Sequence, residues 1–416
     1  MGLGAKLLTA LALVLALAGC AGAQVSPIGA DGAPFALELD ERELWTAAGR
    51  ESEAIARAGK PRAAPAIEAA LTALAARLMP PSTRVPGAPA PDVTVLMDPA
   101  VAAFALPTGR IYVHSGLLAR VEGESRLAAI LAREVAHVTR RDALALFRDG
   151  RRLTAGPTPR APGAALAGLP LARAAAVDGY GDREGEADAE ALRALAAAGF
   201  DPREAPRAFD ALREDLARAR DARGDGPYAL GRAAWLGDRA RSLRALLDRE
   251  PAGVPSTGSA GGAPGASEAA GGTTATVEDA LAQLLLPLVR DNAVLEARAG
   301  HSRSARAQLD RVLAAGPGDV AAHLADGELL RLEAQRAGSR EDARALLARA
   351  RRAFERAAAL DPASPEPHRA LALVAYQAGD AAAARAAFER YLSMRPDAPD
   401  ARRVREYLQE LGPRPR

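Results

Sequence analysis

The sequence predicts an α+β domain, mostly helical with a small sheet, followed by an all-α domain built from repeats. Within residues 41–250, apolar residues recur at helix-like spacing over 41–79, 125–147 and 184–198, and short β-branched runs lie between the first two of these stretches. A stretch of small residues, 251–277, separates this part from the rest. Beyond it, prolines that follow apolar helix ends recur with a period of 34 residues.

The composition limits the class of protein. The chain has 416 residues, with 54 Lys and Arg against 52 Asp and Glu, and this balance argues against a nucleic-acid partner. A single cysteine excludes an internal disulfide framework. The chain has only five histidines, which leaves few imidazoles for a metal site.

The start of the chain has the pattern of a signal peptide followed by a tether. Residues 7–18 form an apolar run that is too short to span a bilayer, which takes about 20 residues. Small residues precede Cys20 and resemble the bacterial lipobox, which implies cleavage before Cys20 and a lipid on it. The alternative is an ordinary signal peptide cleaved after residues 21–23. We expect residues 1–19 to be the signal peptide and residues 20–40 to be a tether.

A lipid on Cys20 implies a location in the bacterial cell envelope, on the periplasmic side. Residue 21 is Ala rather than Asp, which by the enterobacterial sorting pattern favours the outer membrane. No other stretch approaches 18 consecutive apolar residues. We therefore expect an outer-membrane lipoprotein whose contact with the membrane is the lipid on Cys20.

The elements of the first domain, 41–250, follow from local signals. Two prolines, Pro80 and Pro81, end the first helical pattern. A Pro-Thr-Gly turn between two apolar segments indicates a hairpin. The predicted elements are a helix over 41–79, a strand over 93–97, a hairpin of 104–106 with 110–113, and helices over 125–147 and 184–198.

Residues 251–277 consist almost entirely of Pro, Ala, Gly, Ser and Thr. Such a stretch cannot bury enough apolar surface to offset the entropy lost on ordering. We therefore predict a flexible linker between the first domain and a second domain, 278–416.

The second domain has the pattern of the tetratricopeptide repeat, a helix–turn–helix unit of 34 residues. Pro362 and Pro396 lie 34 residues apart, whereas Pro317 lies 45 residues before Pro362. Because 45 is 34 + 11, the middle unit carries an insertion, which we place near residues 338–340. Residues 399–411 would form a capping helix. The alternative is a generic Ala-rich helical bundle.

The helix over 125–147 contains the sequence Arg133-Glu-Val-Ala-His137. An E-x-x-H pattern alone is most simply a solvated helix face, but its surroundings change that interpretation. Four segments of the chain, in the order given below, together resemble peptidase family M48, the gluzincin metallopeptidases. With the lipobox and the repeats added, the chain resembles the periplasmic branch of that family, which acts in outer-membrane protein quality control. The segments are FALPTGRIYVHSGLL (104–118), ESRLAAILAREVAH (124–137), REGEAD (183–188) and AGFDP (198–202).

The resemblance implies a role for each residue of this site. In the family the helix reads H-E-x-x-H, so that two histidines on one face bind zinc and the Glu is a general base. Carried over, His137 is the second metal ligand, Glu134 is the general base and Glu184 is the third ligand. Asp188 would not bind the metal itself but would help to orient the residues that do.

The position of the first ligand is occupied by Arg133, which departs from the family pattern. A guanidinium stays protonated and has no lone pair to give to a metal. Only two of the three ligands of a catalytic zinc site then remain. A guanidinium among Glu134, Glu184 and Asp188 would instead supply the positive charge that buried carboxylates need. The sequence therefore predicts a metallopeptidase fold in which an internal ion pair replaces the metal.

Further differences from the family bear on the site. The family has an Asn where this chain has Ala102, and a second His where Asp142 follows Arg141. No His lies near residues 235–238 either, where the family has one. The remaining His of the first domain, His114, is the candidate substitute ligand.

These observations lead to one main hypothesis and two rivals. The main hypothesis is a catalytically degenerate envelope lipoprotein, without a cofactor, that binds unfolded or assembling envelope proteins. Its edge strand at Phe104, Ala105 and Leu106 would pair with an extended chain, and its repeats would bind clients or assembly machinery. One rival is an active zinc endopeptidase that uses His137, Glu184 and a substitute ligand. The other is a scaffold that acts through the repeats alone.

Overall fold

The computed structural model describes residues 25–58, 64–148, 171, 183–219, 233–249 and 273–412. The predicted signal peptide, Cys20 and linker residues 251–272 lie outside these ranges. The chain divides into two compact units, Met1–Arg213 with Ala229–Leu281, and Glu214–Tyr228 with Ala282–Arg416. Within the described ranges, no helix has the length and apolar character that crossing a membrane requires.

The first unit contains a three-stranded sheet in the order β1-β3-β2. β1 (Asp92–Leu96) runs parallel to β3 (Arg110–His114), and β2 (Ala103–Ala105) runs antiparallel to β3 with Phe104 opposite Tyr112. The predicted hairpin is therefore present, and its turn requires Gly109, where φ is 88°. β2 forms one edge of the sheet.

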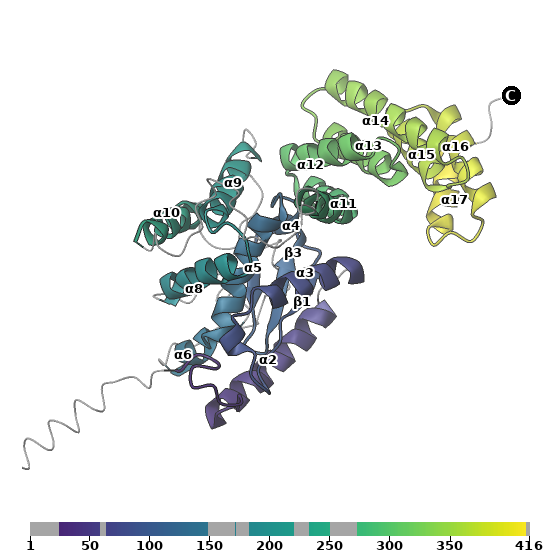
Figure 1. The fold of residues 1–416 in the computed structure, drawn as a ribbon. Helices are drawn as coiled ribbons and strands as arrows, with labels where there is room; N and C mark the ends of the chain where they lie inside the picture. Colours follow the sequence, from purple (N-terminus) through teal and green to yellow (C-terminus); the bar gives the residue numbers. More distant parts are fainter. Residues whose placement is uncertain are drawn as a thin grey trace, which may run out of the picture. The chain divides into compact units, whose positions relative to one another are not determined.

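Helices pack around this sheet, and α5 is the central one (Figure 1). α5 contacts β2, α3 and α8, and it is buried from Leu127 to Thr139. Polar side chains on α5 are therefore removed from water. The helices are α2 (Leu39–Ala58), α3 (Pro65–Arg77), α4 (Ser115–Leu118), α5 (Glu124–Thr139), α6 (Asp142–Arg148), α8 (Glu184–Ala197), α9 (Glu204–Ala219) and α10 (Ala233–Arg249), with a 3₁₀ turn at Pro81–Thr83.

The sequence pattern merged helices that the structure separates. Instead of one helix over 41–79, α2 ends at Ala58 and α3 begins at Pro65, because proline suits the first position of a helix. The predicted helix over 125–147 is divided at Arg141, a left-handed residue with φ of 59° between α5 and α6. Apolar periodicity continues across both breaks, so it does not show them.

The predicted tether 20–40 is not a free segment where the structure describes it. Residues 25–38, called the strap here, lie against the first unit, and α2 begins directly after them. The Ile28 N–H donates to the Thr139 carbonyl at 2.8 Å, and the Phe35 N–H donates to the Pro86 carbonyl at 2.9 Å. Ile28 is buried, and the Phe35 ring stacks on Trp45. The apolar side chains of the strap explain why it packs.

The second unit is all-helical, with α13 packed on α14 and α15 on α16 (Figure 1). The predicted insertion lengthens a helix rather than a loop, because α14 has 21 residues against 14 in α16. α17 is the predicted capping helix. The helices are α11 (Thr273–Ala299), which begins within the predicted linker and ahead of this unit, α12 (Ser302–Ala315), α13 (Val320–Gln335), α14 (Arg340–Leu360), α15 (Glu366–Ala378), α16 (Ala381–Met394) and α17 (Ala401–Glu410).

Candidate functional site

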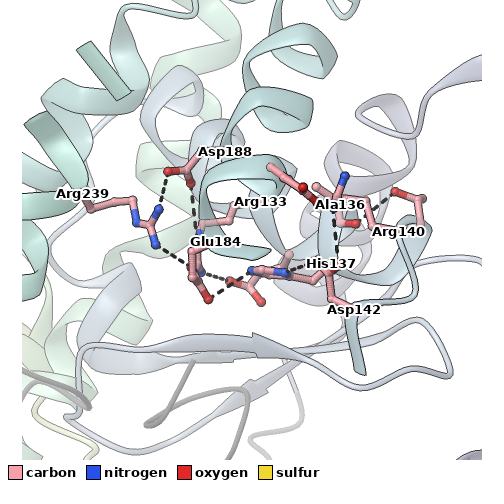
Figure 2. Close-up of polar contacts among 11 residues, drawn as sticks. Arg133, Ala136, His137, Arg140, Asp142, Glu184, Asp188 and Arg239 are labelled. Atoms are coloured by element: carbon pink, nitrogen blue, oxygen red, sulfur yellow. Dashed lines mark hydrogen bonds and ion pairs between the residues drawn. The ribbon is translucent and has the colours of Figure 1, made fainter. Parts of the chain in front are cut away.

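Charged side chains from three helices of the first unit meet beside α5 and form what is called here the ion-pair cluster (Figure 2). α8 contributes two carboxylates that are four residues apart and therefore share one helix face. All members are buried. They are Arg133 and Glu134 on α5, Glu184 and Asp188 on α8, and Arg239 on α10.

Arg133 lies at the centre of the ion-pair cluster. Its Nη1 donates to Glu134 Oε1 at 2.8 Å, and its Nη2 donates to Glu184 Oε2. Its Nε lies 3.8 Å from Asp188 Oδ1. The structure thus places this guanidinium among the three carboxylates expected from the sequence.

Arg239 is a second cation, which the sequence reasoning missed. Its Nη2 donates to Glu184 Oε2 at 2.6 Å, and its Nη1 donates to Asp188 Oδ2 at 2.5 Å. Arg239 lies one residue beyond 235–238, the region where the family has a histidine. The available signal was the spacing of Trp235 and Arg239, because residues four apart on a helix lie side by side.

Trp235 joins the two cations. The guanidinium carbon of Arg133 lies 5.1 Å from the centre of the indole ring, and that of Arg239 lies 5.2 Å from it. Both distances fall within the range of cation–π attraction. Phe209 contacts the same indole edge to face, with 5.7 Å between ring centres. The indole therefore stabilises two like charges that the carboxylates have drawn together.

The charges of the ion-pair cluster do not balance, because three carboxylates face two guanidiniums. Burial raises the pKa of Glu134, and the attraction of Arg133 only partly offsets this effect. Burial likewise raises the pKa of Asp188 against the attraction of Arg239. Burial opposes the charge of Arg133 as well, but Glu184 and Glu134 outweigh it and raise its pKa. Arg133 thus remains a cation, whereas burial opposes the charges of both Glu134 and Asp188.

His137 is held by Asp142, the residue that replaces a histidine of the family pattern. Its Nδ1 lies 2.8 Å from Asp142 Oδ2, and its Nε2 lies 3.8 Å from Glu184 Oε1. The left-handed backbone of Arg141 reverses the chain after α5 and so directs Asp142 back toward α5. The departure at position 142 therefore fixes the imidazole beside the ion-pair cluster.

These residues do not fit a metal ion. The same oxygen of Glu184 accepts from both Arg133 and Arg239, so guanidinium groups fill the space beside it. Among the described residues, no group of three or more His, Cys, Asp or Glu is arranged to hold a metal. His114 does not complete such a group, because it is fully buried on β3 and its Nδ1 faces Asp98 Oδ1 at 3.7 Å.

The edge strand that was expected to pair with a client is covered. Phe104, Ala105 and Leu106 are all buried. A hydrogen bond from the Ala105 backbone reaches the Glu134 carboxylate. The edge position of β2 agrees with the sequence, but its surface is not open to an extended chain in this state.

Comparisons with known proteins agree with this architecture. Residues 65–155 match the family description "Peptidase family M48", and residues 338–409 match "Tetratricopeptide repeat". The chain is 32% identical over 124 residues to the beta-barrel assembly-enhancing protease of Escherichia coli K12, a match that covers 26% of each chain. It is 46% identical over 46 residues to the mitochondrial metalloendopeptidase OMA1 of Schizosaccharomyces pombe, covering 11% of this chain and 14% of that protein.

The matched regions are short. They span 24–28% of the length of the bacterial relatives. Among solved structures, the human IFIT1 dimer matches with a TM-score of 0.26 and 16% identity, over 69% of this chain and 66% of that one. A TM-score at this level supports no argument about function.

Proposed function

We propose that this chain is a catalytically degenerate, metallopeptidase-like protein of the bacterial envelope, because residues 65–155 match peptidase family M48 and residues 338–409 match the tetratricopeptide repeat. It binds unfolded or assembling envelope proteins rather than cleaving them. The similarity to enzymes named beta-barrel assembly-enhancing protease supports the envelope and the class of client.

One observation carries the loss of catalysis: Glu184 Oε2 accepts from Arg133 and Arg239 at once. A metallopeptidase needs a Lewis-acidic metal and a carboxylate that can take a proton from water. Here the guanidinium groups of Arg133 and Arg239 occupy the place beside Glu184 where a metallopeptidase would hold its metal ion. Glu134, the carboxylate at the general-base position, is bound by Arg133 and by the Ala105 backbone. The guanidiniums thus stand where the reaction needs a Lewis acid, and the general-base carboxylate is held by Arg133 instead of facing a metal-bound water.

The repeats provide a surface for a partner. The second unit has a cavity of about 320 Å³, which falls at the low end of ligand-binding cavities. Cationic and aromatic side chains together suit a peptide that carries carboxylates and apolar groups. Its lining includes Arg331, Arg369, Arg403, Tyr376, Tyr407 and Phe388.

The metal content of the purified protein tests the degenerate site. We expect much less than one zinc per chain and no chelator-sensitive cleavage of β-casein, an unfolded probe. Stoichiometric zinc with chelator-sensitive cleavage would establish the rival, an active endopeptidase. Binding is tested on the same sample by the fluorescence anisotropy of labelled, reduced carboxymethylated α-lactalbumin. Arg369→Ala should weaken binding, whereas Arg352→Ala on α14, outside the cavity lining, should not.

We also propose that Cys20 carries a lipid and that the protein is anchored in the outer membrane. The support is the lipobox-like sequence before the single cysteine. Cys20→Ser should release the protein into the soluble periplasmic fraction, because several acyl chains anchor firmly and none would remain. Continued sedimentation of that variant with membranes would contradict the proposal.

A further inference from the structure

The strap closes the groove between α5 and the edge strand β2. Ile28 and Phe35 line one small cavity together with Leu106, Pro107 and His137. This cavity measures about 10 Å³, which is room for about one water molecule. An extended chain that enters this groove beside Ala105, the last residue of β2, needs the space that the strap side chains occupy.

The strap is pinned on both sides of this groove. The Ile28 N–H is hydrogen-bonded to the Thr139 carbonyl at the end of α5, and the Phe35 N–H is hydrogen-bonded to the Pro86 carbonyl in the segment before β1. Gly29 is required on this path, because its φ is 73° and a Cβ there would approach the Ser82 carbonyl oxygen to 1.9 Å. The close fit shows that the strap has a defined seat on the domain.

Arg141, which directly precedes α6, and Arg148, the last residue of α6, hold the C-terminal end of the strap and the start of α2. Arg141 Nη2 donates to Glu38 Oε1 at 2.9 Å, and its Nε donates to Glu41 Oε1 at 3.0 Å. Arg148 donates to Glu38 Oε2 at 2.6 Å and to Asp40 Oδ2 at 2.7 Å. These ion pairs are called the latch.

The backbone conformation of Arg141 also depends on the strap. Its left-handed backbone is unfavourable for an arginine, and such conformations persist only where the surroundings determine them. The strap supplies part of those surroundings, because Arg141 donates to the Ser26 carbonyl at 3.3 Å and lies 5.6 Å from the Phe35 ring centre. Release of the strap therefore removes contacts that hold Arg141, next to Asp142 and His137.

The part of the latch that Glu38 and Asp40 form is suited to open without unfolding the domain, whereas Glu41 is buried. The side chains of Glu38 and Asp40 are 48% and 39% exposed, and exposed ion pairs each contribute little to stability. Segments held by few buried contacts open locally at low free-energy cost.

We infer that the strap is an intramolecular gate, which closes the groove beside the E-x-x-H helix and which an extended client must displace. Closure of the groove by the strap can be tested without any client. That the displacing chain is an envelope client rests on the proposed function.

A cysteine placed under the strap tests the closure. Ala143 lines the closed cavity and is buried, so Ala143→Cys in a Cys20→Ser chain gives one reporter thiol. Glu38→Ala with Asp40→Ala removes part of the latch. We expect this release variant to react with a maleimide about fivefold faster or more, since the three ion pairs that Glu38 and Asp40 make with Arg141 and Arg148 are lost. Glu53→Ala, which removes an exposed ion pair of α2 with Arg57, is the matched control and should change nothing.

Equal maleimide rates in the latched and released chains would overturn the gate. Hydrogen exchange provides a second measurement without the reporter cysteine. The amides of Ile28 and Phe35 should exchange faster in the release variant and unchanged in Glu53→Ala. Exchange at both amides as fast as in an unfolded peptide, in the unmodified chain, would also overturn the gate.

Client binding separates the gate from the proposed function. Reduced carboxymethylated α-lactalbumin should bind the release variant more tightly, by the same factor as the maleimide rate. If maleimide reacts faster but no chain binds this probe, the closure stands and the proposed function fails. If the probe binds all chains equally despite faster labelling, the proposed function stands and the gate fails.

Discussion

Arg239 and Glu184 form a buried ion pair across α10 and α8, with 2.6 Å between Nη2 and Oε2. Because Glu184 also accepts from Arg133 on α5, one carboxylate joins three helices. Removing one partner of such an arrangement leaves uncompensated buried charge, which costs far more than the loss of an exposed pair. The ion-pair cluster is therefore expected to act on stability rather than on catalysis.

Arg133→Ala should lower the free energy of unfolding by about 3 kcal/mol, because it leaves three buried carboxylates with one guanidinium. Urea denaturation followed by circular dichroism measures this loss. Arg241→Ala is the control, since Arg241 is 75% exposed and pairs with Asp238 on the same helix; it should change stability by less than about 0.5 kcal/mol. Equal stability of Arg133→Ala and the unmodified chain would mean that Arg133 faces solvent.

Arg239→Ala should also destabilise the first unit, and its effect should not add to that of Arg133→Ala. Both arginines share Glu184, so the loss of one changes the charge that the other experiences. A double-mutant cycle by urea denaturation should give an interaction energy of about 0.5–3 kcal/mol. Additive effects would show that the two guanidiniums act independently.

Glu134→Gln should leave stability unchanged or raised near pH 7, because it balances two guanidiniums against two carboxylates. The pKa of Glu134 is raised by burial, so protonation favours the folded state. The contribution of this group is complete below its usual pKa of 4.5 and is lost as the pH rises. Unfolding measured across pH should therefore show the advantage of Glu134→Gln at pH 7 and little difference near pH 4. A large loss of stability at pH 7 would contradict the charge count.

Arg133→His rebuilds H-E-x-x-H, but alone it should bind zinc weakly, since Arg239 still occupies Glu184 and Asp188. Adding Arg239→Gln frees Glu184 as a third ligand beside the two histidines. Calorimetric titration should show zinc affinity at least about tenfold higher in the double variant. Stoichiometric tight binding by Arg133→His alone would mean that Arg239 yields Glu184 to a metal.

Acid should loosen the strap. The hydrogen bonds from Arg148 lower the pKa of Glu38 and of Asp40 below their usual values of 4.5 and 3.8. Lowered pKa values mean that the latch contributes fully above these usual values and is lost as the pH falls below them. The measurement is the hydrogen-exchange rate of the Ile28 amide in the release variant divided by its rate in the unmodified chain. Because pH changes the intrinsic exchange rate equally in both chains, that effect cancels in the ratio. This ratio should be large at pH 7 and fall toward one as the pH drops below 3.8; a constant ratio would exclude the latch carboxylates.

The sequence predicted much of the fold because its signals are local. The fold class is confirmed, as are the family and the repeats. The contact of Arg133 with Glu184 was expected, since the E-x-x-H helix and the E-x-x-x-D helix of the family face each other. Arg239 was missed because its partner Asp188 lies 51 residues away and no pattern links them.

The strap and the break at Arg141 were missed for a related reason. Ile28 and Phe35 are isolated apolar residues in a Gly- and Pro-rich segment, which alone indicates a tether. Their burial depends on Thr139 and Pro86, which are distant in the sequence. Arg141, which has the left-handed conformation, is bonded to Glu41 and Glu38, about 100 residues earlier in the chain. The residues next to Arg141 in the sequence therefore do not predict this conformation.

The placement of the two tryptophans makes the protein its own optical probe. Trp45 stacks on Phe35 of the strap, whereas Trp235 lies beside the guanidiniums of Arg133 and Arg239. The chain has no other tryptophan. In a Trp235→Phe chain, the emission reports opening of the strap, and in a Trp45→Phe chain it reports the state of the cations. Gate opening and cluster disruption are thus two separable fluorescence signals, readable in real time without an added dye.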